Sequence, residues 1–145
     1  MMRGGENMRN ISSGPCHHSK CCGQAPKFKR QVLTTGVLNT VANQTAAHIE
    51  VANFDPTETF QVRVQVINWN SGSPVVLLNQ LVTLLPNQLA TLSQAVAPFH
   101  YEVRIFHPGS PNVIANTFAI DAATFTLPGL TFNQEDLMKL DIPFI

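Results

Sequence analysis

The chain has 145 residues, of which 44% are hydrophobic and only 12% are charged, with nine basic and nine acidic side chains. This length suits one domain, and the composition excludes a disordered polyanion and a uniformly basic nucleic-acid binder. The net charge of zero hides an asymmetry, because residues 1–30 carry six basic and one acidic side chain, whereas residues 31–145 carry three and eight. A segment of charge +5 therefore precedes a body of charge −5.

Residues 1–30 contain glycine and proline but no hydrophobic period, which predicts a flexible, basic N-terminal arm. The arm lacks the apolar stretch of an export signal, so we expect no signal peptide. No stretch of the chain approaches the roughly 20 apolar residues of a bilayer-spanning helix, so we expect no membrane insertion. We also expect no nucleic-acid partner, because the basic residues are scattered and Phe28 is the arm's only aromatic residue.

The body reads as a series of short strands separated by turn signals such as Asp55-Pro56 and Pro108-Gly109. In segment 60–66, hydrophobic and polar residues alternate with a period of two, as they do in 99–106, where Phe99 and Tyr101 would face one way and Glu102 the other. In chain order, the strand-like segments are 32–41, 46–52, 60–66, 75–85, 89–93, 99–106 and 113–120. This pattern predicts one all-β domain over residues 31–120, an antiparallel β-sandwich or jelly roll of about eight strands.

Residues 121–145 are predicted to form a C-terminal extension. The segment 125–132, around Pro128-Gly129, could supply a last strand. Asn133 could cap a short helix over 134–140, whose early acidic residues suit a helix N-terminus.

A search for catalytic motifs finds no Gly-x-Ser-x-Gly elbow, no phosphate-binding loop and no dinucleotide-binding fingerprint, so we expect no enzyme. Glu50 and Glu102 each lie on the polar side of a predicted strand, where a solvated surface charge is the ordinary interpretation. Trp69, at a strand end, could stack on a sugar, but a core or rim aromatic is the simpler interpretation.

Histidines in the body do not form a recognisable metal motif. His48, His100 and His107 are isolated, and His100 with Glu102 lacks the second histidine and the glycine pattern of a cupin site. We therefore expect no cofactor and no metal site in the body.

The arm holds all three cysteines within seven residues, in the sequence Cys16-His17-His18-Ser19-Lys20-Cys21-Cys22. These cysteine and histidine side chains could bind zinc, although adjacent cysteines rarely ligate one tetrahedral ion. Reduced, inert thiols are a second interpretation. Intermolecular disulfides are a third, because an odd number of cysteines cannot all pair within one chain.

The arm and body together resemble the endospore appendage (Ena) subunits, which build pilus-like fibres on bacterial endospores. In that family a connector with an aliphatic residue and Cys groups precedes a jelly roll, and Ile11, Cys16, Cys21 and Cys22 could fill those places. Segments 99–105 and 111–116 also resemble small β-proteins of spore-forming bacteria. One departure is that the body has no cysteine to accept a connector thiol, so a cross-link would join arm to arm or arm to another protein.

The resemblance implies a structural subunit that self-assembles by β-strand augmentation and connector docking, with Ile11 as connector anchor and intermolecular disulfides from Cys16, Cys21 and Cys22. Its partners would be copies of itself, in a helical or stacked-ring polymer on the endospore surface, and an anchoring protein there. The alternative is an exosporium or coat binding module that recognises carbohydrate or another surface protein.

Overall fold

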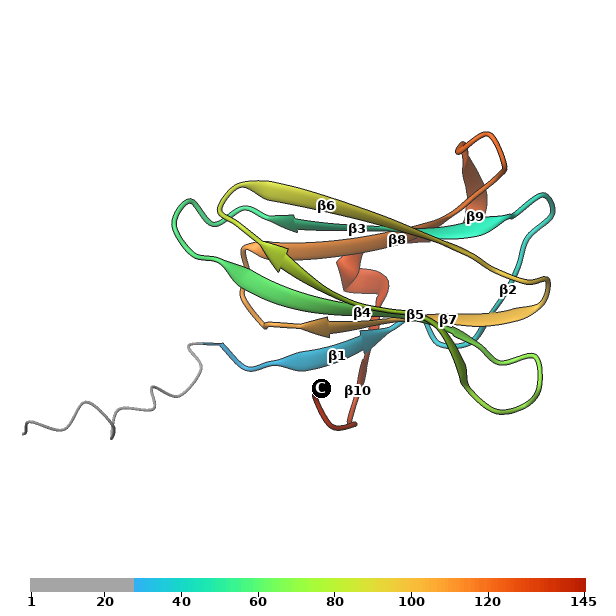
Figure 1. The fold of residues 1–145 in the computed structure, drawn as a ribbon, viewed down its shortest axis with the longest axis horizontal. Helices are drawn as coiled ribbons and strands as arrows, with labels where there is room; N and C mark the ends of the chain where they lie inside the picture. The colour runs from blue at the N-terminus through green and yellow to red at the C-terminus, as the bar shows by residue number, and fades with distance from the viewer. Residues whose placement is uncertain (1–27) are drawn as a thin grey trace, which may run out of the picture.

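The computed structural model describes residues 28–145, and these form a β-sandwich of two antiparallel sheets (Figure 1). The six-stranded sheet has the order β10-β1-β7-β4-β5, with β2 also paired to β7. Its strands are β1 (Gln31–Thr34), β2 (Leu38–Asn39), β4 (Phe60–Asn68), β5 (Val75–Leu84), β7 (His100–His107) and β10 (Met138–Leu140). The four-stranded sheet has the order β6-β3-β8-β9. Its strands are β3 (Ala46–Asn53), β6 (Gln88–Ala95), β8 (Val113–Ile120) and β9 (Thr126–Phe132).

Strand pairings nest around the turn between β5 and β6. The pair β4–β7 lies closest to this turn, followed by β3–β8 and finally by β1–β10, which joins the first and last strands. The chain therefore winds like a long folded hairpin, which is a jelly-roll-like arrangement. The predicted all-β sandwich is confirmed.

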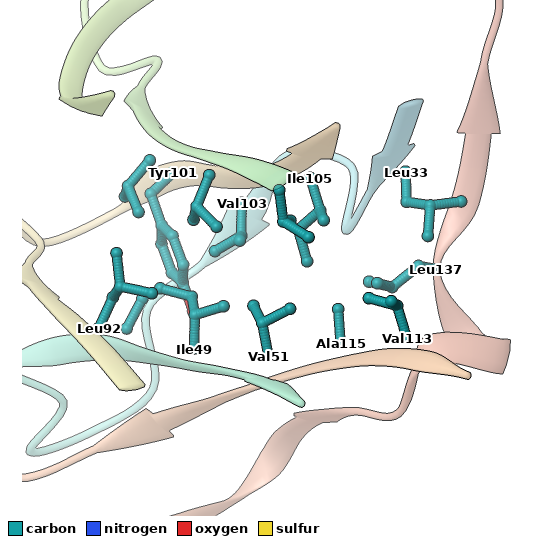
Figure 2. Packing of buried hydrophobic residues seen from close by; sticks show 14 of the residues in the cluster. Leu33, Ile49, Val51, Leu92, Tyr101, Val103, Ile105, Val113, Ala115 and Leu137 are labelled. Carbon is teal, nitrogen blue, oxygen red and sulfur yellow. The ribbon is translucent and has the colours of Figure 1, made fainter. Parts of the chain in front are cut away.

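Alternation of buried and exposed residues explains why these segments form strands. In β3, burial alternates along the strand, with Ile49 and Val51 fully buried. From the other sheet, Val103 and Ile105 of β7 point toward them across the core (Figure 2). Because successive side chains of a strand point to opposite faces, a period of two buries one face of each sheet.

A second layer of contacts covers part of the outer face of the six-stranded sheet. Phe106, on the face opposite Ile105, is 1% exposed and packs edge-on against Phe144, with ring centroids 5.6 Å apart. The guanidinium of Arg30 lies 5.2 Å from the centre of the Phe144 ring. Both ends of the described chain thus shield this face, which sequence periodicity did not indicate.

Two predicted strands differ in detail from the structure. The segment 32–41 is divided into β1 and β2, because Gly36 adopts a φ of +69° between them. Phe99 lies outside β7, has a φ of +86° and is 67% exposed, so it does not share the buried face of Tyr101.

The C-terminal residues complete both sheets. The predicted strand over 125–132 is present as β9, at the edge of the four-stranded sheet. The predicted helix over 134–140 is wrong. Gln134–Asp136 form only a single 3₁₀ turn, η1, behind a capping box at Asn133. After this turn, Leu137 enters the core and β10 pairs with β1. A strand forms here because the free backbone groups of β1 bind this segment more strongly than the few internal hydrogen bonds of a two-turn helix would stabilise it.

Candidate functional site

Strands β5 and β6 follow each other in the chain, and each is the edge strand of its own sheet. The two edge strands lie on the same side of the sandwich. Among the described residues, β5 pairs only with β4, and β6 only with β3. The turn between them is held in place because Asn87 N–H donates to the carbonyl oxygen of Asp55 (3.2 Å) and Leu85 N–H donates to Gln88 Oε1 (2.7 Å). We call β5 and β6 together the uncharged edge.

This edge takes its name from the absence of charged side chains. No Asp, Glu, Lys or Arg occurs between Arg63 and Glu102, a segment that includes both edge strands and the turn joining them. Natural sheets normally protect their edges with charges, prolines or short strands, because unpaired backbone N–H and C=O groups can pair with another chain. A long edge without charges lacks this protection and can therefore pair with a strand of another chain.

Exposed hydrophobic side chains reinforce this character along β5. Val75 and Val76 are 52% and 51% exposed, and Leu81 is 48% exposed. Leu77 has no partner on β4, because the register shifts between Val66 and Ile67. This irregularity is a β-bulge, which increases local twist, and it lies toward the beginning of the strand, so the segment from Leu78 to Leu84 remains in regular register with β4.

The opposite edge of the sandwich has a different construction. It consists of β9, which is interrupted by Pro128 and Gly129 in the middle of the strand, and of β10, which has only three residues and includes Lys139. The pairing of β9 with β8 is also irregular between Phe118 and Ile120. These are recognised protections against edge pairing, so the two edges are unlike.

Glu102 is not the solvated charge predicted from the sequence. It is 3% exposed on the outer face of the six-stranded sheet, and both carboxylate oxygens are occupied. Oε1 accepts from Thr34 Oγ1 (2.7 Å) and Arg104 Nε (2.9 Å). Oε2 accepts from Trp69 Nε1 (2.9 Å) and Arg104 Nη2 (2.9 Å). This cluster joins β1, β4 and β7, and it places the half-buried Trp69 at the end of β4 rather than on open surface.

His107 is buried at the end of β7 and is held in one tautomer. Gly109 N–H donates to Nδ1 (2.9 Å), so the ring proton lies on Nε2, which donates to the carbonyl oxygen of Val113 (2.8 Å). Burial lowers the pKa of His107, because the charged imidazolium is poorly solvated there. His100 lies at the other end of the same strand and His48 in the other sheet, so the structure does not bring the three histidines together.

Asp55 organises the bend that leads from β3 to β4 and that supports the turn of the uncharged edge. Its Oδ1 accepts backbone hydrogen bonds from Thr57 (2.9 Å) and Glu58 (2.8 Å), and its Oδ2 accepts from Asn112 (3.0 Å). These hydrogen bonds, led by the one from the Thr57 backbone, lower the pKa of Asp55 from 3.8 to about 2.

Several residues singled out in the sequence lie outside the described part of the chain. They are Ile11, Cys16, His17, His18, Cys21 and Cys22, and the connector, disulfide and zinc interpretations stay predictions. Between residues 28 and 145, no group of three or more His, Cys, Asp or Glu side chains could hold a metal ion. No helix within that range has the length and apolar character needed to cross a bilayer.

Comparison with models of protein families, with curated proteins and with solved structures finds no match for this chain. The candidate site therefore depends on the chain's own geometry. Sequence reasoning did not identify the uncharged edge, although the absence of charges between Arg63 and Glu102 is visible in the sequence. The missing information was the position of the two strands, because strand-edge status depends on the pairing of distant segments.

Proposed function

We propose that this protein is a structural subunit that assembles with copies of itself into a fibre, using the uncharged edge for β-strand augmentation. The observation that carries the proposal is β5, a ten-residue strand without charge, unpaired on one side within residues 28–145, with exposed valines and leucines. Augmentation supplies affinity through backbone hydrogen bonds, and the apolar side chains add burial.

The unlike edges of the sandwich favour a repeating contact. If the uncharged edge of one copy meets a different surface of the next copy, the contact is heterologous and leaves one free contact surface at each end. Such a contact propagates into a filament unless its rotation closes a ring, whereas pairing of two identical edges stops at a dimer. Lys139 and the break at Pro128 limit self-pairing of the β9/β10 edge.

The N-terminal arm extends the proposal. Its net charge of +5 opposes the body's −5, which supports electrostatic docking of the arm on a neighbouring body. With the resemblance of Ile11, Cys16, Cys21 and Cys22 to an Ena connector, this supports a pilus-like fibre on the endospore surface, made durable by intermolecular disulfides. Because the body has no cysteine, these disulfides join arms to one another or to an anchoring protein.

The test places a charge on the uncharged edge without disturbing the fold. Leu81 lies opposite Arg63 in the β4–β5 ladder, so Leu81→Glu gives the edge a negative charge and places a carboxylate opposite Arg63, which already donates to Asn79 of β5. Val37→Glu is the matched control, because Val37 is 51% exposed in the loop between β1 and β2. Both variants should fold, but only Leu81→Glu should fail to assemble.

Negative-stain electron microscopy and sedimentation velocity give the readout. The unmodified protein and Val37→Glu should form filaments, and Leu81→Glu should sediment as a monomer. The proposal is wrong if the unmodified protein remains strictly monomeric at high concentration under oxidising conditions. It is also wrong if Leu81→Glu forms filaments of ordinary length.

A further inference from the structure

A hollow lies on the outer face of the four-stranded sheet and borders the uncharged edge, because Gln88 and Leu89 of β6 are part of its lining. Its volume is about 480 Å³, within the range of about 300–1,000 Å³ that is usual for small-molecule sites. The floor is Ala52 of β3, which lies between Leu89 of β6 and Ile114 of β8 in the strand ladder. A small side chain between two large ones leaves a depression in the sheet surface.

An aromatic wall borders this depression. Phe54 directly follows β3, lines the hollow and is 63% exposed. Its backbone is held in place, because Phe54 N–H donates to the carbonyl oxygen of Asn112 (2.8 Å). A Phe ring on a fixed backbone offers an apolar face to a ligand at little entropic cost.

Two amide side chains in the lining are oriented by bonds to their oxygen atoms. Gln88 Oε1 accepts from Leu85 N–H (2.7 Å), and Asn116 Oδ1 accepts from Gln134 N–H (3.1 Å). Neither NH₂ group has a further hydrogen-bond partner among residues 28–145. The hollow is therefore lined by two positioned amides with donors to spare.

An acceptor completes the set. Glu50 lines the hollow and lies opposite Asn116 in the β3–β8 ladder. Its side chain is 39% exposed, and its Oε1 lies 3.5 Å from His48 Nε2, so one carboxylate oxygen keeps its full accepting capacity. Donors and an acceptor thus surround an apolar floor and an aromatic wall.

We propose that this hollow binds a neutral saccharide. The C–H face of a pyranose ring is apolar and packs on an aromatic ring, while its hydroxyl groups both donate and accept hydrogen bonds. Planar amides and a carboxylate match such hydroxyl groups, and fixing their orientation beforehand reduces the entropy lost on binding. An anionic ligand fits poorly, because Glu50 is the only charged residue in the lining.

The proposal does not depend on self-assembly. Strand augmentation uses the free backbone of an edge, whereas the saccharide would lie on the sheet face. Binding per chain can therefore be measured whether or not the protein forms filaments, so the failure of one proposal leaves the other intact.

Isothermal titration calorimetry of the full-length protein tests the site with three probes: maltotriose, cellotriose and triacetylchitotriose. At least one should bind with one site per chain. Asn116→Asp is the decisive variant, because its carboxylate still accepts the Gln134 N–H but can no longer donate. It should keep its thermal unfolding midpoint and weaken binding at least tenfold.

Phe54→Ala should also weaken binding at least tenfold, since it removes the aromatic wall. Phe125→Ala is the matched control, because Phe125 is 70% exposed outside the hollow and should bind as the unmodified protein does. The proposal is overturned if none of the three probes binds at millimolar concentration. It is also overturned if Asn116→Asp and Phe54→Ala bind as tightly as the control.

Discussion

The indole N–H of Trp69 donates to the carboxylate of Glu102 across 2.9 Å, and the two residues join strands β4 and β7 on the outer face of the six-stranded sheet. The same carboxylate accepts from Thr34 of β1, so one side chain connects three strands. Alternation of polar and apolar residues assigns the Glu102 carboxylate to solvent, but in the structure this charge holds three strands together.

Glu102→Gln should lower the free energy of unfolding by about 2–4 kcal/mol. In the unmodified protein, four donor groups share the two carboxylate oxygens of Glu102, whereas a glutamine side chain has only one acceptor oxygen. Some buried donors therefore lose their acceptor, and Arg104 loses its counter-charge. Urea denaturation followed by the fluorescence of Trp69, the only tryptophan, measures the change. Glu50→Gln, at a half-exposed carboxylate, should change stability by less than about 0.5 kcal/mol. Equal effects of the two substitutions would contradict a structural role for Glu102.

Gly109 and Gly72 offer a matched pair for testing close packing. Both have a positive φ, +88° and +80°, but a Cβ on Gly109 would overlap the carbonyl group of Lys29, whereas a Cβ on Gly72 would meet nothing within 4 Å. Gly72→Ala should cost about 1 kcal/mol through backbone strain alone. Gly109→Ala should cost about 2–3 kcal/mol, because steric overlap adds to the strain. Urea denaturation of both variants compares the two costs, and similar values would show that Lys29 moves aside freely.

The pH dependence of stability should reveal His107. Its pKa in the folded protein lies below the ordinary value of 6.5, so at acidic pH the unfolded chain binds a proton that the folded chain does not. Stability should therefore fall as pH decreases from about 6.5 toward the lower folded pKa. Urea denaturation between pH 7 and pH 5, in steps of about half a unit, measures the slope. His107→Gln should flatten this pH dependence of the free energy of unfolding. A slope that remains in His107→Gln would assign the effect to another group.

Asp55 should act in a separate, more acidic window. Its pKa is lowered from 3.8 to about 2, so its contribution to stability is complete above pH 3.8 and is lost as pH falls toward 2. Asp55→Asn should abolish this acid-sensitive step without changing the window of His107. Circular dichroism during acid titration of both proteins provides the comparison, and an unchanged step below pH 3.8 would contradict the assignment.

Replacing Cys16, Cys21 and Cys22 with Ser should separate assembly from durability. If disulfides lock contacts that augmentation has already made, the triple variant should still form filaments. Those filaments should dissociate at lower temperature and denaturant concentration than the unmodified ones, as electron microscopy after graded heating would show. Filaments of equal resistance would assign the cysteines another role, with zinc binding the first to examine by metal analysis of protein prepared without chelators.

The amino-acid sequence by itself determined the class of fold. Period-two alternation in segments such as 60–66 can bury one face only as a strand, and the turn residues divide the chain into pieces too short for anything but antiparallel pairing. These effects are local, so they can be read from neighbouring residues. The sequence also carried the charge asymmetry and the cysteine arm, which together suggested assembly.

Only the tertiary structure decided which strands lie at the edges and which outer faces are covered. Glu102 is buried because Thr34 of β1, Trp69 just after β4, and Arg104 of its own strand all contact it. β10 is a strand rather than a helix because β1 offers it a free edge. These outcomes depend on pairings between residues far apart in the chain, which alternation does not encode. For the same reason, the run without charges from Val64 to Tyr101 acquires its meaning only when β5 and β6 are seen at one edge of the sandwich.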